Sequence, residues 1–373
     1  MGSPYIEFAK LRSEARFNLA TSGVAPYPLA ELPFRREDLE LNGASPYGYA
    51  PLIDRLASKC GVPAQCVVAA NGTSMANHLV MAAVVKPGDE VLIEKPTYEP
   101  LLDLASYLGA EIRRFPRNVD GSFGIDPGVV ESRLTAATRL IVLTNLHNPT
   151  GLGVEESALS AIGEMARRVN ARVLVDEVYL EMDFRRTLAS AFSLDPECFI
   201  VTSSLTKAYG LGALRCGWIL AEPSLARRIW RLNDLFGVMP AHPAERLSVV
   251  ALDHLGQVAR RSQSLLQSNR VRTRAFLQSR QDLETVWPPC GTIVAPRLKS
   301  NLQPNAEQNE VDRLFQILRD KYETSIVPGR FFEMPEHFRL GMGGPTEVLK
   351  EGLKRLEMAL DELAGNGDES DWD

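Results

Sequence analysis

The sequence predicts an α/β protein whose larger part is a doubly wound, mostly parallel sheet and whose smaller part is α+β. Two observations lead to this prediction. Between Pro51 and Pro223, short apolar runs alternate with amphipathic stretches, in the order that strands and helices take in such a sheet. The runs are mostly apolar rather than alternating, which is typical of parallel strands covered by helices on both faces.

The apolar runs give the expected strands, which are Cys66–Ala70, Glu90–Ile93, Arg139–Thr144, Arg172–Val175, Cys198–Thr202 and Cys216–Ala221. The amphipathic stretches give the expected helices, which are Ser74–Val85, Tyr98–Tyr107, Glu155–Val169 and Ser224–Leu235. A longer helical pattern then runs from His242 to about Arg280 and connects this part to the rest of the chain. Beyond it, short apolar runs and two helical patterns (Asn309–Lys321 and Thr346–Leu363) indicate a smaller α+β unit.

The length of the chain predicts two domains, because 373 residues exceed what one hydrophobic core normally serves. Residues 46–285 form the expected large domain, which includes the long interdomain helix. Residues 1–45 and 286–364 form the expected small domain, because the first segment lacks the repeating strand–helix pattern. Residues 365–373 are acidic and contain glycine, which is typical of a disordered tail.

The composition excludes several classes of function. The formal charge of −6 and the pI near 5.6 argue against a surface that binds nucleic acid. The sequence shows neither an apolar stretch of membrane-spanning length nor a signal peptide. The five cysteines are odd in number and form no C-x-x-C pair, so neither a disulfide framework nor a metal site is expected. We therefore expect a cytoplasmic protein that binds neither membranes nor nucleic acid.

Unusual polar residues follow the expected strands at their carboxyl ends, where parallel sheets bind ligands. After the first strand, Asn71-Gly72-Thr73-Ser74 opens a helix, and backbone amides beside a glycine can hold a phosphate there. The alternative is that Thr73 or Ser74 only caps the helix. The segment matches neither the G-x-G-x-x-G pattern nor a Walker loop, so NAD and nucleoside triphosphates find no support.

Two more strand ends carry candidate residues. Asn148 lies in a turn made by proline and glycine, and its amide either donates to a cofactor oxygen or only belongs to the turn. Asp176 directly follows a buried apolar run, so its carboxylate needs a cation or strong donors. A protonated pyridine nitrogen is such a cation, and a helix cap or an arginine pair is the alternative.

Lys207 follows another strand end, beside the hydroxyls of Ser203 and Ser204. Such an amine is typical of a lysine that forms a Schiff base with the aldehyde cofactor pyridoxal phosphate, and a solvated surface charge is the alternative. Arg215 lies downstream and could pair with a phosphate. Arg339 begins a short strand and either holds a substrate carboxylate or is an exposed charge on an edge strand.

Taken together, these motifs resemble a known family. Asn148-Pro-Thr-Gly, Asp176-x-x-Tyr179, Ser204-x-x-Lys207 and Arg215 occur in this order, at intervals of 28, 31 and 8 residues. With Arg339 downstream, the set resembles the class I/II aminotransferases of the fold-type I pyridoxal-phosphate enzymes. The resemblance runs from about Asn18 to Leu363 and implies the fold type I of these transferases, with pyridoxal 5'-phosphate as cofactor.

The family pattern implies a role for each matching residue. Lys207 carries the cofactor as a Schiff base and later moves the proton between the substrate α-carbon and the cofactor. Asp176 pairs with the pyridine nitrogen, and Tyr98 either stacks on the ring or is a core tyrosine. The residues implied to bond the ring hydroxyl are Asn148 and Tyr179. The residues implied to grip or approach the phosphate are Gly72, Thr73, Ser74, Ser204 and Arg215. The residues implied to hold the substrate carboxylate are Arg339, Gly23 and Asn148.

The implied activity is transfer of an α-amino group between an amino acid and a 2-oxo acid. It implies a homodimer in which Tyr47, or else Tyr49, reaches the phosphate across the interface. Aspartate-specific members often have a histidine where this chain has Leu101, so the resemblance does not extend to aspartate specificity. A lyase, a decarboxylase or a cyclising synthase keeps the same anchors and is an alternative. A non-catalytic sensor domain is a further alternative, although the N-terminal region shows no helix-turn-helix pattern.

Overall fold

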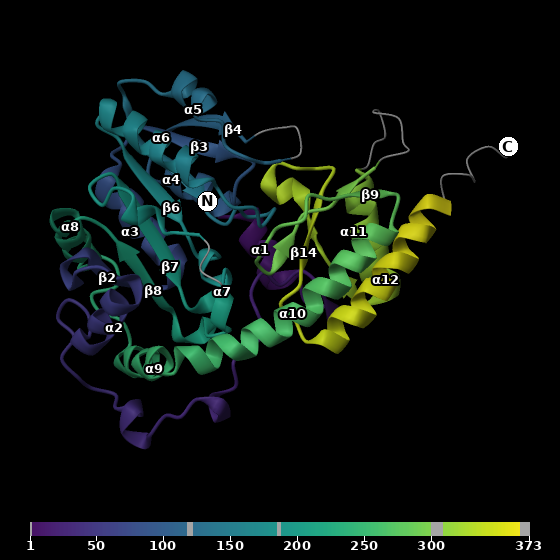
Figure 1. Ribbon diagram of the computed structural model, residues 1–373, viewed down its shortest axis with the longest axis horizontal. Coiled ribbons are helices and arrows are strands. Elements are labelled where there is room, and N and C mark those ends of the chain that lie inside the picture. The colour runs from purple at the N-terminus through teal and green to yellow at the C-terminus, as the bar shows by residue number, and fades with distance from the viewer. Residues whose placement is uncertain (1, 118–121, 185–187, 300–308, 366–373) are drawn as a thin grey trace.

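A seven-stranded sheet is the largest element of the computed structural model, which describes residues 2–117, 122–184, 188–299 and 309–365 (Figure 1). In spatial order its strands are β2 (Val67–Asn71), β8 (Cys216–Leu220), β7 (Phe199–Ser204), β6 (Arg172–Asp176), β5 (Thr138–Thr144), β3 (Glu90–Lys95) and β4 (Glu111–Pro116). Neighbouring strands from β7 to β4 run parallel, whereas β8 runs antiparallel to both of its neighbours. The prediction of a mostly parallel sheet is confirmed.

Two features of this sheet were not predicted, namely the strand β4 and the antiparallel direction of β8. The edge strand β4 was not expected, because it carries Arg113 and Arg114, which pair with Glu90 and Glu333, in place of a buried apolar run. The antiparallel direction of β8 follows from its connection to β7. That connection, residues 205–215, holds the short helix α7 (Thr206–Tyr209) and is too short for the crossover that a parallel strand needs.

Helices cover both faces of the sheet, as predicted. On one face lie α3 (Gly72–Val84), α4 (Glu99–Tyr107) and α8 (Pro223–Asn233). On the other face lie α2 (Ala50–Cys60), α5 (Pro127–Arg133), α6 (Glu156–Arg168) and α9 (His242–Asp253). Successive residues of β6 show this division. Leu174 packs in the core that includes α3, α4 and α8, whereas Val173 and Val175 pack in the core that includes α2, α5, α6 and α9. Neighbouring side chains of one strand therefore face different layers.

The helical pattern that begins at His242 forms two helices where one was expected. α9 ends at Asp253, and α10 (Leu255–Ser279) follows it. At His254 the backbone leaves helical geometry, with φ −112° and ψ 20°, and Gly256, two residues further on, has a low helix propensity. From this break, α10 runs away from the large sheet to a second group of elements (Figure 1).

The second group is α+β, as predicted. Its strands are β1 (Phe17–Asn18), β9 (Leu283–Glu284), β10 (Ile293–Val294), β11 (Arg297–Leu298), β12 (Thr324–Ser325), β13 (Val327–Pro328) and β14 (Phe338–Gly341). Its helices are α1 (Pro4–Leu11), α11 (Glu310–Tyr322) and α12 (Thr346–Gly365). β14 lies between β10 and β13 in an antiparallel sheet, and β1 pairs with β12, which brings the start of the chain into this group.

The C-terminal helix α12 runs through Gly365, which was expected to open the tail, and the rest of the predicted tail, residues 366–373, lies outside the described residues. The domain division at residues 45/46 and 285/286 stays a prediction.

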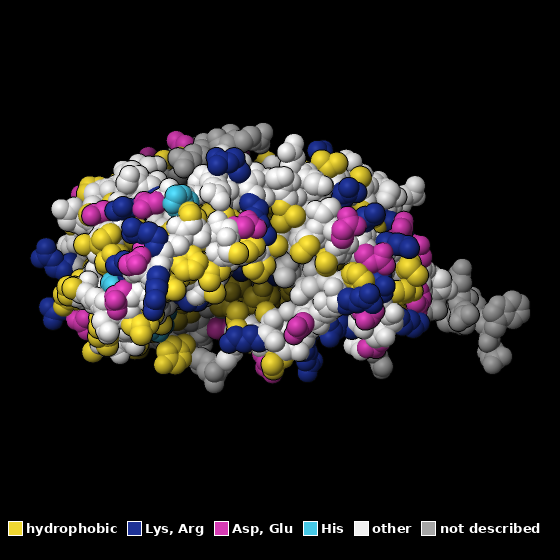
Figure 2. All heavy atoms as spheres, turned by 90° about the horizontal axis from the view of Figure 1, so that it is seen from below, with side chains coloured by type: hydrophobic (Ala, Val, Ile, Leu, Met, Phe, Trp, Pro, Cys, Tyr) yellow, Lys and Arg dark blue, Asp and Glu magenta, His cyan; other side chains and the backbone are white. Residues whose placement is uncertain are grey.

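One face of the molecule mixes both signs of charge (Figure 2). On the face shown in Figure 2, Lys and Arg side chains lie among Asp and Glu side chains, and hydrophobic side chains gather in a hollow near its middle. No helix of the described residues has the length and apolar character needed to cross a lipid bilayer.

Candidate active site

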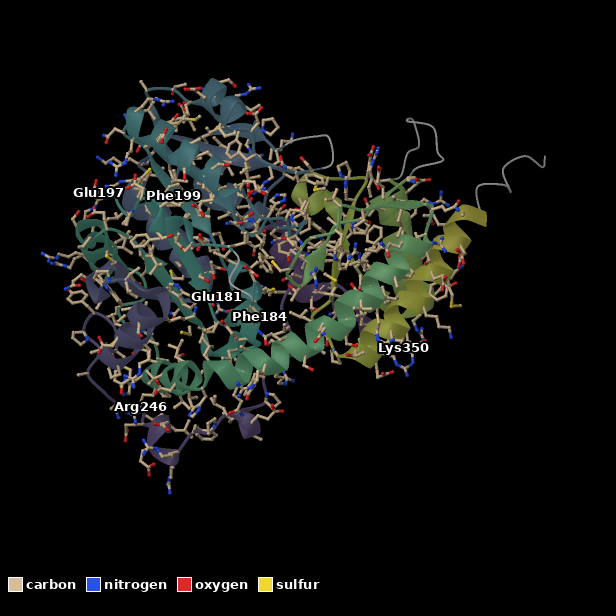
Figure 3. The ribbon with its side chains drawn as sticks, viewed as in Figure 1. Glu181, Phe184, Glu197, Phe199, Arg246 and Lys350 are labelled. Carbon is tan, nitrogen blue, oxygen red and sulfur yellow. The ribbon has the colours of Figure 1, made fainter. Side chains whose placement is uncertain are left out.

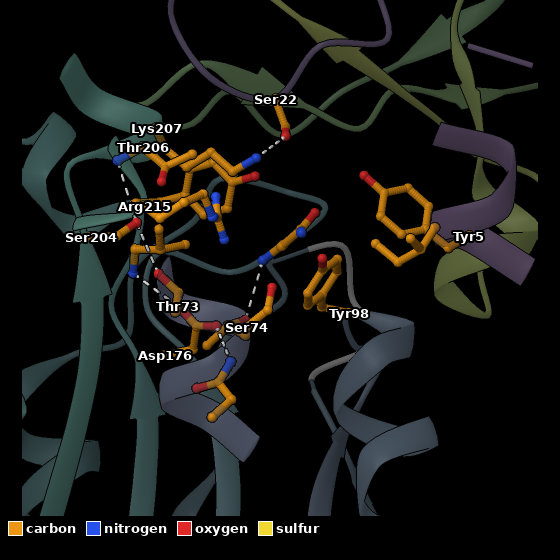
Figure 4. A pocket seen from close by; sticks show the side chains of 16 residues that line it. Tyr5, Ser22, Thr73, Ser74, Tyr98, Asp176, Ser204, Thr206, Lys207 and Arg215 are labelled. Atoms are coloured by element: carbon orange, nitrogen blue, oxygen red, sulfur yellow. Dashed lines mark hydrogen bonds between the residues drawn. The ribbon is translucent and has the colours of Figure 1, made fainter. Parts of the chain in front are cut away.

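A cavity of about 230 Å³ lies beyond the carboxyl ends of β5, β6 and β7, at the start of α3 (Figure 4). The predicted site residues that line it are Thr73, Ser74, Tyr98, Asn148, Asp176, Tyr179, Ser204, Lys207 and Arg215. The parallel strands bring these residues together, because side chains that follow each strand meet at the same edge of the sheet. Their chemical roles stay predictions at this point.

Lys207 lies on α7, which begins directly after β7, and its side chain enters the cavity. Its Nζ donates a hydrogen bond to Oγ of Ser22 at 2.9 Å. Burial lowers the pKa of the Lys207 amine, because the surrounding protein solvates an ammonium less well than water does. A lysine with a lowered pKa holds more of the neutral amine, which is the form that attacks an aldehyde.

Asp176 ends β6 and faces the same cavity. Burial raises the pKa of its carboxyl to about 6, although two hydrogen bonds oppose this rise. Oδ2 accepts from Nδ2 of Asn77 at 2.8 Å, and Oδ1 accepts from the backbone N–H of Val178 at 3.0 Å. The hydroxyl of Thr202 donates to Oδ1 of Asn77 at 2.6 Å, which keeps the N–H end of that amide turned toward the carboxylate.

The end of the cavity next to α3 is built to hold an anion. α3 begins at Gly72, whose φ of +74° favours glycine, and a Cβ there would lie 2.2 Å from Nη2 of Arg215. The Oγ1 of Thr73 donates to Oγ of Ser204 at 3.0 Å. Helix-start amides, two hydroxyls and a guanidinium therefore converge at one point. The expectation that Thr73 or Ser74 caps the helix is wrong, because Asn71 holds the N-cap position.

Arg339 lies on β14, the middle strand of its sheet, and only 1% of its surface is exposed. The alternative of an exposed edge-strand charge is therefore wrong. Its Nη1 donates to Oδ1 of Asn148 at 2.9 Å, and its Nη2 donates to the phenol of Tyr5 at 2.9 Å and to the backbone oxygen of Ala20 at 3.2 Å. Its Nε is buried and has no hydrogen-bond partner among the described residues. A buried guanidinium with an unused donor is suited to a carboxylate.

A buried ion pair supports the turn that carries Asn148. The backbone N–H of Asn148 donates to Oγ1 of Thr144, the last residue of β5, at 3.2 Å. The N–H and hydroxyl of Thr144 both donate to Oε1 of Glu94, at 2.8 and 2.7 Å. Arg117 completes this arrangement by donating from Nε to Oε2 of Glu94 at 2.8 Å. The turn is thus held by charged groups that the sequence analysis did not single out.

Two of the tyrosines that line the cavity, Tyr98 and Tyr179, were predicted from the sequence. Tyr98 immediately precedes α4, and its ring meets that of Tyr5 edge-on, with centroids 5.5 Å apart. Burial raises the pKa of the phenols of Tyr98 and Tyr179, so both remain protonated at neutral pH. Both can therefore donate a hydrogen bond to an oxygen in the cavity.

The predicted site residues outside the lining of this cavity are Gly23, Tyr47, Gly72 and Arg339, although Gly72 adjoins Arg215 and Arg339 bonds Asn148, both of which line it. Gly23 packs on Lys207, where a Cβ would lie 3.2 Å from the backbone oxygen of the lysine. Tyr47 is 47% exposed, and its hydroxyl donates to Oδ2 of Asp234 at 3.4 Å. Tyr49, by contrast, is half-buried against His242 of its own chain, with ring centroids 5.0 Å apart.

Several lining residues were not predicted from the sequence. Tyr5 and Ile6 come from α1, Ser22 precedes Gly23, and Asn77 lies on α3. Asn77 could have been found, because it follows Thr73 by one helical turn and so lies on the same face of the helix. Tyr5, Ile6 and Ser22 gave no such signal, since only the tertiary fold brings them to Lys207.

A second cavity of about 770 Å³ lies on the opposite face of the sheet, against β7, β8 and the segment that follows β6. Glu177, next to Asp176, faces it, and burial raises the pKa of Glu177 to about 8. Glu181 also lines it and accepts hydrogen bonds from Nζ of Lys59 at 2.5 Å and from the hydroxyl of Tyr209 at 2.8 Å. Figure 3 shows Glu181 and Phe184 near α7. The alternation of side chains along β6 thus separates two buried carboxyls.

Comparison with known proteins gives consistent matches. The family model described as aminotransferase class I and II matches residues 35–356. Capreomycidine synthase from Streptomyces vinaceus is 27% identical over 299 residues, which cover 80% of this chain and 75% of that protein. Arginine–pyruvate transaminase from Pseudomonas aeruginosa is 25% identical over 320 residues, which cover 83% and 79%. The solved structure of a PLP-dependent aminotransferase from Streptococcus suis superposes with a TM-score of 0.88 at 23% identity and covers 96% of this chain and 97% of its own.

Proposed function

This chain belongs to the class I and II aminotransferase family, and from this premise we propose how its residues perform the reaction. The protein is a pyridoxal-phosphate-dependent aminotransferase that acts on amino acids and 2-oxo acids. One observation carries the assignment of residues. Asp176, the last residue of β6, and Lys207, which follows the adjacent strand β7, face one cavity whose end at α3 is built for an anion.

The cavity fits the cofactor at two places, the pyridine nitrogen and the phosphate. Asp176 supplies a buried carboxylate for the pyridine nitrogen, and burial is the main cause of its raised pKa. Gly72, Thr73 and Ser204 make the cradle for the phosphate, which a Cβ at Gly72 would fill. Arg215 adds a positive charge and Ser74 a further hydroxyl at the same end. Pyridoxal phosphate, when bound, withdraws electrons from the α-carbon of the amino acid attached to it.

The other cofactor residues lie around the ring position. Tyr98 lines the cavity on the side of α4, where we propose that its ring stacks on the cofactor. Asn148 and Tyr179 offer an amide N–H and a phenol to the ring hydroxyl oxygen. The amide oxygen of Asn148 accepts from Arg339, so its N–H group is free to turn toward the ring.

Arg339 is the proposed site for the α-carboxylate of the substrate. Its guanidinium is buried and adjoins Asn148, and a planar fork of donors binds a carboxylate in a fixed orientation. The backbone at Gly23 lies within contact of Lys207 and would face the same carboxylate. A fixed carboxylate fixes the direction of the α-hydrogen, which is the proton that Lys207 removes and returns.

We propose that two copies of the chain form the working enzyme. Tyr47 is exposed and does not reach the cavity of its own chain, whereas Tyr49 packs inward, so Tyr47 is the better candidate to reach a partner's phosphate site. The loop beside it exposes the large apolar side chains of Leu235, Phe236, Val238 and Met239, and a second copy would cover them. Light scattering of the purified protein tests this proposal.

The cysteine composition supports a further proposal, that the enzyme is cytoplasmic.

A cyclising synthase is the second candidate, because the chain is similar to capreomycidine synthase. Such an enzyme would keep the same anchors for the cofactor, so the motifs do not separate it from a transaminase. The two reactions differ in the fate of the α-amino nitrogen. A transaminase moves this nitrogen to a second carbon skeleton, whereas a cyclising enzyme leaves it on the product.

An isotope experiment tests the function. The holoenzyme is incubated with a panel of ¹⁵N-labelled amino acids and an unlabelled 2-oxo acid, and the products are separated by mass spectrometry. We expect the label to appear in the amino acid derived from the 2-oxo acid, together with an equal amount of the donor's 2-oxo acid. Products that keep the label on the donor skeleton, now as a ring, would overturn transamination and support the cyclising synthase.

A further inference from the structure

The side chains of Ser22, Lys207 and Tyr179 line the same cavity. Oγ of Ser22 accepts a hydrogen bond from Nζ of Lys207 at 2.9 Å, which Figure 4 shows as a dashed line. Burial raises the pKa of Tyr179, and a hydrogen bond with Ser22 opposes this rise, as a donor to the phenol oxygen does. A serine hydroxyl has one proton and two lone pairs, so it can accept from the amine and donate to the phenol at the same time.

The segment that carries Ser22 is fixed against Lys207 from two sides. The backbone oxygen of Ser22 accepts from the hydroxyl of the buried Thr292 at 2.7 Å. The backbone N–H of Val24 donates to the backbone oxygen of Lys207 at 2.9 Å. Between them, Gly23 approaches so closely that an added Cβ would lie 3.4 Å from Cδ of Lys207. The backbone of Ser22 is therefore held beside Lys207 by contacts that do not involve the amine.

We propose that Ser22 is a positioning residue that holds the free amine of Lys207 inside the cavity, beside Tyr179. The proposal rests on the proposed function, in which Lys207 is alternately attached to the cofactor and free. A free lysine side chain has many rotamers, and fixing one of them costs conformational entropy. The Ser22 hydroxyl selects a rotamer in which the amine stays within the cavity and can act on the substrate's α-hydrogen.

The surroundings of Lys207 make the contribution of Ser22 measurable. Burial lowers the pKa of the lysine, and the charged or titratable groups that act on its amine are Tyr5, Arg339, Asp176 and Arg215. Ser22 is an uncharged group bonded directly to the amine. An acceptor oxygen favours the ammonium form over the amine, so Ser22 opposes the effect of burial.

Competitive labelling of the full chain, without cofactor, tests the proposal. Trace acetic anhydride acetylates amines, and mass spectrometry of the Lys207 peptide across a pH series gives the pKa of that one amine. In Ser22→Ala we expect the pKa of Lys207 to fall by about one unit, the size expected for a hydrogen bond to a charged group. Ser22→Thr keeps the hydroxyl and should restore the pKa. Thr21→Ala, which removes an exposed hydroxyl from the same segment, is the matched control and should change nothing.

A further variant, Thr292→Val, keeps the test decisive if Ser22→Ala folds poorly. It leaves the Ser22 hydroxyl in place but removes the hydrogen bond to the Ser22 backbone, so it should also lower the pKa of Lys207, by a smaller amount. An unchanged pKa in Ser22→Ala, or an equal shift in Ser22→Thr or Thr21→Ala, would overturn the proposal. If wild-type protein failed to take up pyridoxal phosphate, the proposed function would fail, while the labelling result would still decide the role of Ser22.

Discussion

Replacing Asp176 by asparagine should stabilise the cofactor-free protein while weakening its hold on the cofactor. Burial raises the pKa of this carboxyl from the ordinary value of 3.8 to about 6. Between these two pH values the folded protein keeps a proton that the unfolded chain has lost. Stability therefore falls as the pH rises through this window, and the full cost of the buried charge is present above it.

The pKa values set the size of the effect. A rise in pKa from 3.8 to about 6, at about 1.36 kcal/mol per pKa unit, lowers the free energy of unfolding above pH 6 by about 3 kcal/mol. Asp176→Asn removes this cost and should raise the free energy of unfolding at pH 8 by an amount approaching it. The hydrogen bonds can adapt, because the hydroxyl of Thr202 can accept as well as donate and so allows the Asn77 amide to turn.

Urea unfolding with and without pyridoxal phosphate, at pH 5 and pH 8, measures both effects. Glu177→Gln is the matched control, because burial also raises the pKa of this neighbouring carboxyl, to about 8, yet its side chain faces the second cavity. Both variants should be more stable than wild type at pH 8 without cofactor. Only Asp176→Asn should lose the extra stability that the bound cofactor adds. The reasoning is refuted if Asp176→Asn is less stable than wild type without cofactor, or is stabilised by the cofactor as much as wild type.

Three further substitutions test other parts of the site. Gly72→Ala puts alanine at a φ that favours glycine and places its Cβ against Arg215. The dissociation constant for pyridoxal phosphate should therefore rise by about tenfold or more, as measured by fluorescence titration. Asn77→Leu removes a hydrogen-bond donor from Asp176 and so raises the pKa of that carboxyl further. In the same titration, the affinity for pyridoxal phosphate should therefore fall at pH 6 and recover toward pH 9. A loss of affinity that does not depend on pH would contradict this prediction. Arg339→Lys replaces a planar fork of donors by a point charge. In steady-state kinetics, the KM for the amino acid should therefore rise by about tenfold or more. An unchanged KM would show that Arg339 does not bind the substrate.

Much of the sheet and of the cofactor site could be predicted from the sequence, because both depend on local patterns in chain order. Apolar runs mark buried parallel strands, and polar residues after them must meet at one edge of the sheet. This reasoning places Asn148, Asp176 and Lys207 around one cavity, as the structure does. The antiparallel direction of β8 could also have been inferred from the short connection that precedes it.

The remaining features depend on tertiary contacts that leave little trace in the sequence. Ser22 and Tyr5 reach the cavity because the N-terminal segment crosses Lys207 and α1 packs beside α4. The edge strand β4 carries charged residues that pair with distant partners, so no apolar run marks it. The break at His254 interrupts a pattern that continues on both sides, and only the backbone geometry shows it.

The visible absorption spectrum of the purified protein with pyridoxal phosphate tests the central claim most directly, with wild type and Lys207→Ala measured side by side. We expect a yellow band in wild type that disappears when a suitable amino acid is added and returns when a 2-oxo acid follows. Lys207→Ala should lack this cycle. A wild-type protein that stays colourless, or a Lys207→Ala variant that cycles as wild type does, would contradict an aminotransferase that works through Lys207.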